Sequence, residues 1–444
     1  MLFSRRKLRL IIIPLLIEQA LAVTIGMADS IMVASAGESA VSGVSLVDTV
    51  NLLLFYLFSA LAGGGSVVIS QLIGQKNVDR AKEASKQLVY LVFAVSLSLA
   101  IFTLLFRVSL LKLIFGSVSA EVMENAKIYF LFTAISYPFL GIYHAGASVY
   151  RAMGNTKISM TSSIIMNLLN IFGNAMLIYG FKMGAMGAGI ATLFARTVGA
   201  FIMLILVCDK KQLVHVKKLF RYKPNFILIK QICRIGVPNG LEHGMFQFGK
   251  VITQSVITLF GTVQIAANAV ASSLTSLQYI PGTAIGHALI TVVGTSIGAN
   301  EKEEAKIYTR KLVKLTYAII FLISLVLCLL PNTLIGFYGL SSESSAIAKK
   351  IIITHSIMVC TIWPISFTLP NAFRAASDVK FPMIIAVISM WIFRVGFSFI
   401  LAVHFKMGVM GVWVAMFMDW LFRAIIFMIR YFRKTWLKKY HGLT

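Results

Sequence analysis

Long, continuous apolar runs dominate this chain of 444 residues, and short segments rich in lysine and arginine separate them. Apolar residues make up 58% of the positions, and a membrane-spanning helix needs about 20 of them. A transmembrane β-barrel would instead show alternating segments of about ten residues. The composition therefore predicts an all-α polytopic membrane protein with twelve spans. The expected spans are 10–34, 46–73, 87–111, 127–150, 158–180, 186–208, 229–260, 270–297, 313–331, 349–372, 382–403 and 407–430.

Basic residues gather before each odd-numbered span and after the last one, whereas loops such as 36–45 and 261–266 have almost none. Because cytoplasmic loops are the basic ones, this pattern places both termini in the cytoplasm and the chain in the cell (plasma or inner) membrane. The flanks also explain the net charge of +25, so we expect the lipid bilayer and no nucleic acid as a partner. The basic segments contain Arg5 to Arg9, Lys76 to Lys86, Arg151 and Lys157, Lys210 to Lys230, Lys302 to Lys314, Arg374 and Lys380, and Arg430 to Lys439.

The two halves of the chain resemble each other at an offset of about 224 residues. An even number of spans in each half gives parallel repeats related by an axis along the membrane normal. The matched pairs are Pro14-x-x-x-Glu18 with Pro238-x-x-x-Glu242, Ile73-Gly-Gln-Lys76 with Ile297-Gly-Ala-Asn300, Phe181-Lys-Met-Gly with Phe405-Lys-Met-Gly, and, one residue out of step, Arg151 to Lys157 with Arg374 to Lys380.

This duplication predicts two pseudo-symmetric six-helix lobes around a central cavity. We expect an N-lobe at 1–208, a cytoplasmic linker at 209–228, a C-lobe at 229–430 and a basic cytoplasmic tail at 431–444. Transporters that rock two lobes about a central cavity have this architecture. A channel would show a pore element with a selectivity loop, and the sequence contains none.

Two acids, Glu18 and Asp29, lie in the first apolar segment, where a membrane span normally carries none. An ionisable group in hydrocarbon is costly unless it is paired or lines a wet cavity, so it marks a transport path or an ion site. Asp29 is therefore the first candidate for function. The alternative is that both acids lie at the interfaces of an ordinary span.

The ordered motifs resemble the multidrug and toxic compound extrusion (MATE) family, over nearly the whole chain. The resemblance implies an antiporter that exports small organic, often cationic, compounds in exchange for Na⁺ or H⁺. It implies no other cofactor, no enzymatic activity and, in our interpretation, a monomer. The motifs are Gly26-Met-Ala-Asp29-Ser-Ile-Met-Val, Ser70-Gln71-Leu-Ile-Gly74, Arg151-Ala-Met-Gly-Asn-Thr-Lys157, Leu169-Asn170-Ile-Phe-Gly-Asn174 and Gly184-Ala-Met-Gly187.

By this resemblance, Asp29 is the cation-coupling acid, and Asn170 and Asn174 line the same N-lobe cavity. These two amides are one turn apart on one helix face, and Asn167 extends the stripe. Their oxygens, together with Asp29, form a candidate Na⁺ site to which the hydroxyl of Thr197 could add. The alternative is that the amides make interhelical hydrogen bonds. Where this chain has Asn174, the proton-coupled branch commonly has an acid, which puts a paired-acid relay in doubt.

The C-lobe departs further from the family, because Phe246 and Trp363 occupy the positions where the sodium-coupled branch carries acids. Glu242 lies one turn before Phe246 and is a candidate substitute. Its repeat mate Glu18 favours the alternative that both acids pair with Lys or Arg. Lys250 is a candidate counter-charge inside the cavity.

Other polar residues complete the set of candidates. Asp48 enters the second span from outside and is a further candidate cation or substrate ligand, whereas Arg394 and Asp419 are expected to form a structural interhelical pair. The four cysteines show no paired spacing, so we expect neither a disulfide nor a metal site. No catalytic or nucleotide-binding motif is present in the sequence. The alternative function is a lipid-linked glycan flippase of a related superfamily, for which a cavity rich in Arg and Lys would bind pyrophosphate.

The charge pattern predicts the topology directly. Reporters fused after Lys86, Lys157, Lys218 or Lys306 are expected to read cytoplasmic, and a reporter near Gly37 external, because basic loops stay inside. An external reading at Lys218 would contradict the twelve-span order.

Overall fold

The computed structural model describes residues 2–116, 118–217, 219, 221 and 223–438, with the backbone alone for residues 25–30. Within these residues every regular element is a helix. Several helices begin at a side chain that accepts a backbone N–H of the first turn, which satisfies a donor that the helix cannot. Asn77, Ser119 and Ser341 do so at the starts of α3 (Val78–Phe115), α4 (Ala120–Ala152) and α12 (Ser342–Thr361).

The chain forms two compact units, Arg5–Gly240 and Leu241–Thr444 with Met1–Ser4. We call them the N-unit and the C-unit. Their boundary falls inside α7 (Phe226–Thr258), not in the 209–228 linker that the sequence predicted as the divider. The physical reason is that the first half of α7 packs on α2 of the N-unit through Gly236. The first residues join the C-unit because the backbone N–H of Leu2 donates to Glu304, at 2.8 Å.

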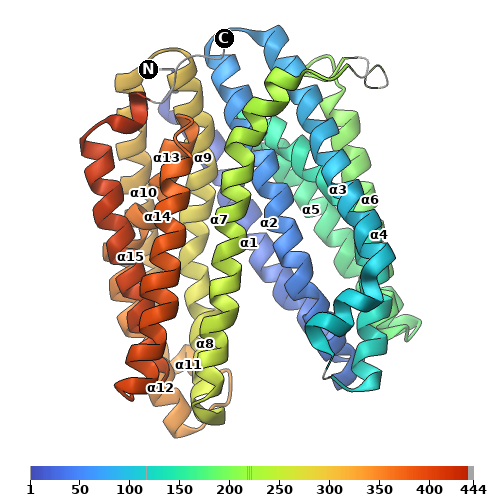
Figure 1. The fold of residues 1–444 in the computed structure, drawn as a ribbon, viewed down its shortest axis with the longest axis vertical. Coiled ribbons are helices and arrows are strands. Elements are labelled where there is room, and N and C mark those ends of the chain that lie inside the picture. The colour runs from blue at the N-terminus through green and yellow to red at the C-terminus, as the bar shows by residue number, and fades with distance from the viewer. Residues whose placement is uncertain (1, 117, 218, 220, 222, 439–444) are drawn as a thin grey trace. The chain divides into compact units, whose positions relative to one another are not determined.

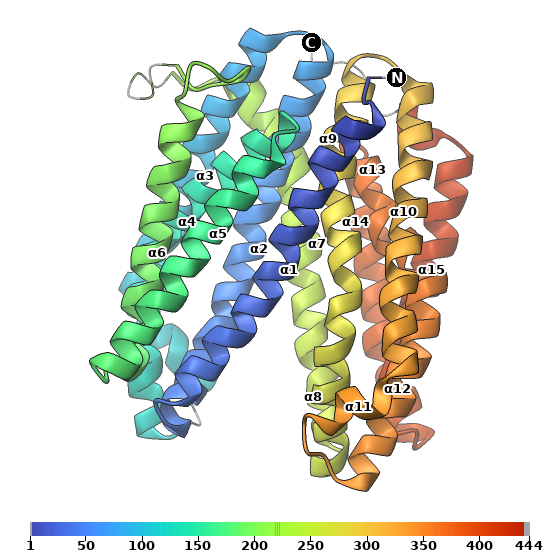
Figure 2. The same cartoon turned by 180° about the vertical axis from the view of Figure 1, so that it is seen from behind.

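The N-unit contains six helices in the expected order and the start of α7. α4 packs against α2, α3 and α6, while α1 packs against α5; Figures 1 and 2 show these helices running side by side. The elements other than α3 and α4 are α1 (Arg5–Ala34), α2 (Glu38–Gly74), α5 (Thr156–Asn174), its π-helical continuation η1 (Ala175–Gly180) and α6 (Gly184–Val207).

The C-unit follows the same order with more breaks in its helices. α9 packs against α10 and α13, and α8 packs against α12. Its elements other than α12 are the rest of α7, α8 (Gly261–Ser276), η2 (Leu277–Tyr279), α9 (Ile280–Gly298), α10 (Lys302–Leu329), α11 (Pro331–Gly336), η3 (Pro364–Thr368), α13 (Pro370–Ala375), α14 (Lys380–Ser389), η4 (Met390–Gly396), η5 (Phe399–His404), α15 (Val409–Phe432) and η6 (Thr435–Lys438).

Among the described residues, nine helices are long and apolar enough to cross a membrane, and a bent pair makes a tenth. This pair joins Ser342–Thr361 to Pro364–Ala375 at an angle of 58°. Pro364 lies at the bend, where its ring and missing N–H interrupt the helix. α1 and α7, with 30 and 33 residues, coincide with the first and seventh expected spans. The all-α polytopic fold class is confirmed.

Backbone turns at equivalent positions confirm the duplication. A positive φ is uncommon for residues other than glycine, yet Lys76 and Asn300 have φ of 60° and 61°, and Lys182 and Lys406 have 55° and 56°. Each pair is 224 residues apart. The two copies therefore enter the following helix through the same left-handed turn.

The described part of the linker lies along α3. The Lys86 ammonium donates to the carbonyl of Arg221 at 2.5 Å, and the Gln87 amide donates to the carbonyl of Lys223 at 2.7 Å. These bonds satisfy backbone groups that have no helical partner. The longest polar connection is thus held against the N-unit.

Two glycines allow α2 and α7 to cross closely. A Cβ added at Gly64 would lie 2.7 Å from the backbone nitrogen of Gly236 and 2.7 Å from the carbonyl oxygen of Ile232. Small residues let membrane helices approach in this way. The neighbouring Gly63 has room, because its added Cβ would lie 3.9 Å from the nearest atom, in Asn239.

This crossing predicts a position-specific effect of alanine. Gly64→Ala should lower the apparent unfolding temperature in detergent, because overpacking typically costs about 1–3 kcal/mol. Gly63→Ala is the matched control: it gains the same helix propensity without the clash and should be neutral or stabilising. Equal unfolding temperatures for the two variants would contradict the close crossing.

Candidate functional site

Asp29, the acid that the sequence singles out, lies within α1, and its side chain lies outside the described residues. Its proposed role therefore stays a prediction. α1 packs against α5, and α5 carries both amides that the resemblance connects with Asp29. The helices that carry the three N-unit candidates are thus neighbours.

Asn170 and Asn174 are buried near the end of α5, with exposed fractions of 9% and 2%. The amide nitrogen of Asn170 donates to the hydroxyl of Thr192 on α6, at 3.3 Å. Asn174 is the last residue of α5 before the π-helical turn η1. Such π-helical interruptions occur frequently at functional sites. The arrangement places buried amide and hydroxyl oxygens on two adjoining helices.

The other predicted members of this stripe are bonded elsewhere. Asn167 donates to the Ser163 hydroxyl on its own helix at 3.2 Å, and the Thr197 hydroxyl donates to the carbonyl of Leu193 at 2.7 Å. Thr192, which sequence reasoning missed, is the α6 hydroxyl that contacts Asn170. Thr192 and Thr197 are both α6 threonines, and only the packing of α6 on α5 tells them apart.

Asp48 belongs to a separate polar cluster on α2 and α4. Its carboxylate accepts hydrogen bonds from Asn51, at 3.1 Å, and from the Tyr129 hydroxyl, at 3.0 Å. The Tyr137 hydroxyl donates to the Asn51 oxygen at 2.8 Å. The Asp48 residue itself is exposed. The spacing of Asp48 and Asn51 was evident in the sequence, whereas their tyrosine partners on α4 were not.

Glu18 and Glu242, the repeat mates, each face an arginine of the same repeated motif. Glu18 lies 3.7 Å from Arg151 and accepts a 2.6 Å hydrogen bond from Ser159. Both carboxylate oxygens of Glu242 lie 2.7 Å from one guanidinium nitrogen of Arg374. This geometry favours the structural alternative for Glu242, because the guanidinium engages both of its oxygens.

The C-unit has a cluster of cations around the positions where the family's acids are missing. The guanidinium of Arg394 lies 5.2 Å from the centre of the Phe246 ring. It lies 4.0 Å from Asp419, the carboxylate that Arg423 binds at 2.8 Å. Lys250 is exposed on α7, one turn beyond Phe246. The expected neighbours Arg394 and Asp419 are therefore brought together, with Arg423 as the closer partner.

The second missing acid is replaced by part of an aromatic stack. Trp363 is buried and stacks on Tyr279, with ring centres 5.3 Å apart, and on Phe367, at 5.2 Å. Aromatic pairs in offset or edge contact stabilise a core beyond their burial alone. The C-unit thus has rings where a sodium-coupled relative would have a carboxylate.

A buried hydrogen-bond network in the C-unit was not foreseen from the sequence. The two ring nitrogens of His355 contact the Tyr279 hydroxyl and the Gln278 oxygen, each at 2.7 Å. The Gln278 amide donates to the hydroxyls of Ser324 and Ser356. These residues come from η2, α10 and α12 and share no sequence spacing. The network links the helices around the break between α8 and α9.

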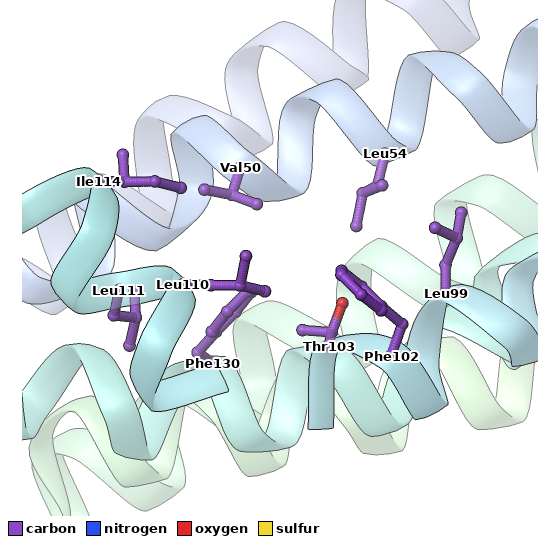
Figure 3. Close-up of a pocket in the computed structure, with 9 residues that line it drawn as sticks. All are labelled: Val50, Leu54, Leu99, Phe102, Thr103, Leu110, Leu111, Ile114 and Phe130. Atoms are coloured by element: carbon purple, nitrogen blue, oxygen red, sulfur yellow. The ribbon is translucent and has the colours of Figure 1, made fainter. Parts of the chain in front are cut away.

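An apolar pocket of about 180 Å³ lies in the N-unit between α2, α3 and α4. Figure 3 shows leucine and phenylalanine side chains pointing into it, with the Thr103 hydroxyl as the polar group among the residues drawn. It offers no carboxylate or amide oxygen for a cation. We therefore do not assign the candidate site to this pocket. Within the described residues, no cluster of three or more His, Cys, Asp or Glu forms a metal site either.

Two duplicated helical units with buried polar groups inside the spans define a polytopic membrane transporter of the parallel-repeat class. A family model described as MatE matches residues 14–176 and again residues 238–400. The chain belongs to the MatE family. The two matches are 224 residues apart, as the repeats are.

Characterised and uncharacterised relatives match over nearly their whole length. The chain is 26% identical to the uncharacterized transporter YisQ of Bacillus subtilis, covering 96% of this chain and 94% of YisQ. It is also 26% identical to the probable multidrug resistance protein NorM of Thermotoga maritima, covering 98% and 94%. A solved outward-facing multidrug resistance MATE family transporter of the MOP superfamily has the same fold, with a TM-score of 0.90, 22% identity and coverage of 98% and 96%.

The ion pair of Glu242 and Arg374 predicts non-additive effects on stability. Arg374→Met should sharply reduce the yield of monodisperse protein, because an uncompensated buried charge costs about 3–5 kcal/mol. The double variant Glu242→Leu/Arg374→Met should recover most of the loss, since it removes both charges. Lys311→Met, at an exposed position on α10, controls for the loss of one cation. A stable Arg374→Met single variant would return Glu242 to the candidate cation ligands.

Proposed function

We propose that this protein is a secondary active exporter of small organic, often cationic, compounds, driven by entry of Na⁺ or H⁺ through alternating access. The observation that carries the proposal is the pair of buried amides Asn170 and Asn174 on α5, the helix that packs against the Asp29-bearing α1. The NorM relative, described as a probable multidrug resistance protein, supports an organic substrate.

The chemistry of this site suits a monovalent cation. A carboxylate supplies the charge, and amide and hydroxyl oxygens supply further ligands for a hard cation. We propose Asp29, Asn170 and Asn174 as the coupling residues, with the Thr192 hydroxyl next to Asn170 as an additional member. A cation in this site neutralises Asp29, which lowers the cost of a carboxylate inside the membrane. Binding of a substrate cation and of the coupling ion is then mutually exclusive.

Between the two coupling ions, we favour Na⁺. A proton needs one carboxylate of raised pKa, and the Asn170 and Asn174 amides cannot replace a second acid in a proton relay. Sodium instead benefits from several neutral oxygen ligands. The asparagine at position 174, where the proton-coupled branch commonly has an acid, is the feature that decides the preference.

We further propose the plasma or inner membrane as the location, with both termini cytoplasmic and the protein acting as a monomer. The basic flanks that motivate this topology are tested by the reporter fusions described above. The flippase alternative is not favoured, because the N-unit candidates are an acid and amides, and these groups suit cations.

Proteoliposomes test the proposal most sharply. Export of ethidium, a fluorescent organic cation, should follow an imposed Na⁺ gradient, and Asp29→Asn should abolish the gradient-driven part while the variant still inserts and remains monodisperse. Asn is nearly isosteric with Asp and removes only the titratable charge. Asn174→Ala should weaken export driven by Na⁺ alone, since it removes one oxygen ligand.

The controls separate the ion from the site. Asn167→Ala is the matched amide control, because Asn167 donates to Ser163 on its own helix, and it should leave export intact. Export driven by a H⁺ gradient in strictly Na⁺-free buffer, with no effect of added Na⁺, would overturn the sodium preference. Full gradient-driven export by Asp29→Asn would overturn the role of Asp29.

A further inference from the structure

Within the C-unit spans, cations outnumber carboxylates. The described carboxylates there are Glu242 and Asp419, and Glu242 is bound to Arg374. Asp419 is left to serve both Arg394 and Arg423. A surplus of positive charge inside a membrane protein is costly and is retained where it serves a function.

Arg394 is the less compensated of the two arginines that share Asp419. Arg423 binds the Asp419 carboxylate at 2.8 Å and donates to the carbonyl of Ala386 at 3.1 Å. Arg394 reaches Asp419 only at 4.0 Å, and its other terminal nitrogen contacts the sulfur of Met416 at 3.1 Å. A thioether sulfur is a weak acceptor. Arg394 therefore retains capacity to bind an anion.

Arg394 also occupies a telling place in the repeat. In the N-unit, Asn170 donates to Thr192; in the C-unit, Arg394 donates to Met416. Both members of the second pair lie 224 residues beyond the first, and both pairs join the fifth and sixth spans of their repeat. The C-unit thus places a guanidinium where the N-unit places a candidate cation ligand.

A second cation lies beside this arginine. Lys250 and Phe246 are one turn apart on α7 and share a helix face. Lys250 and Arg394 are close enough for their charges to repel, and no described carboxylate lies within ion-pair distance of Lys250. Lys250 is exposed and the Arg394 side chain is 12% exposed, so both can be reached by a ligand.

Aromatic rings continue from these cations into the unit. The Phe246 ring lies under Arg394 and packs edge-on against Phe367, with centres 6.2 Å apart. Phe367 stacks on Trp363. A flat aromatic ligand can stack on such rings while its charged group reaches the cations. An inorganic anion would gain nothing from them.

From this geometry we infer that the C-unit carries an organic-anion site, in which Lys250 and Arg394 bind the carboxylate of an aromatic substrate and Phe246 contacts its ring. The inference deepens the proposed function, on which it rests, by naming a substrate class. Aromatic compounds that carry a carboxylate, alone or with a cationic group, are exported in addition to simple organic cations.

Two fluorescent probes test the site directly. Dansylglycine and dansylglycinamide differ only in that the first carries a carboxylate. The purified full chain in nanodiscs should bind dansylglycine about tenfold more tightly, the effect of one charge-assisted hydrogen bond of about 1.4 kcal/mol. Lys250→Gln should remove most of this preference and leave dansylglycinamide binding unchanged. Lys311→Gln, an exposed cation on α10, is the control and should keep the preference.

The position of Lys250 keeps the test interpretable, because an exposed lysine is not needed for folding. Arg394→Gln should have the same effect if the variant remains monodisperse. Equal binding of the two probes by the parent protein, or an unchanged preference in Lys250→Gln, would overturn the inference. Displacement of dansylglycine by inorganic pyrophosphate as readily as by unlabelled aromatic carboxylates would also overturn it, and would point to a phosphate-bearing lipid instead.

Failure of this inference is distinguishable from failure of the proposed function. Lys250→Gln should still export ethidium under an ion gradient, because that cation uses the N-unit acid. Normal ethidium export without a dansylglycine preference would refute the organic-anion site alone. A dansylglycine preference without any ion-driven ethidium export would refute the proposed function alone.

Discussion

An ionised group inside a membrane must be compensated, and this constraint organises both halves of the protein. Its clearest expression is the repeated ion pair, Glu18 with Arg151 and Glu242 with Arg374. Each pair joins the first span of a repeat to the motif that ends its fourth span. Because a charge left without its partner would be strongly destabilising, the pairs hold these helices together in both units. The remaining ionisable groups are then the ones free to serve transport, and Asp29 is the foremost of them.

The two units have kept this framework and diverged in the groups that line their fifth and sixth spans. The N-unit places the amide of Asn170 against a threonine, and the C-unit places the guanidinium of Arg394 against a methionine. The C-unit also replaces both family acids with rings, Phe246 and Trp363. A duplicated fold can thus provide one unit suited to cations and another suited to aromatic anions. This division gives a physical basis for a broad range of substrates within one architecture.

The sequence predicted the fold well because the signals for it are local. Apolar runs, basic flanks and the 224-residue repeat identified the spans, and the prolines marked the bend at Pro364. The boundary inside α7 escaped prediction, since it depends on the contact of Gly64 with Gly236. The candidate site was predicted in part. Spacing within one helix identified Asn170 and Asn174, but Thr192 became evident only when α6 was packed on α5. Partners on different helices leave no periodic trace in one chain.

The central claim is that Asp29 binds either the coupling ion or the organic cation, and equilibrium linkage tests it most directly. The affinity of the purified protein for tetraphenylphosphonium would be measured by calorimetry at low and high Na⁺, and separately at two pH values. Competition for one site requires that the coupling ion weaken binding of the organic cation, and reciprocally. The account predicts weaker binding at high Na⁺ in the parent protein and no Na⁺ dependence in Asp29→Asn. An affinity that is independent of both Na⁺ and pH in the parent protein would contradict it.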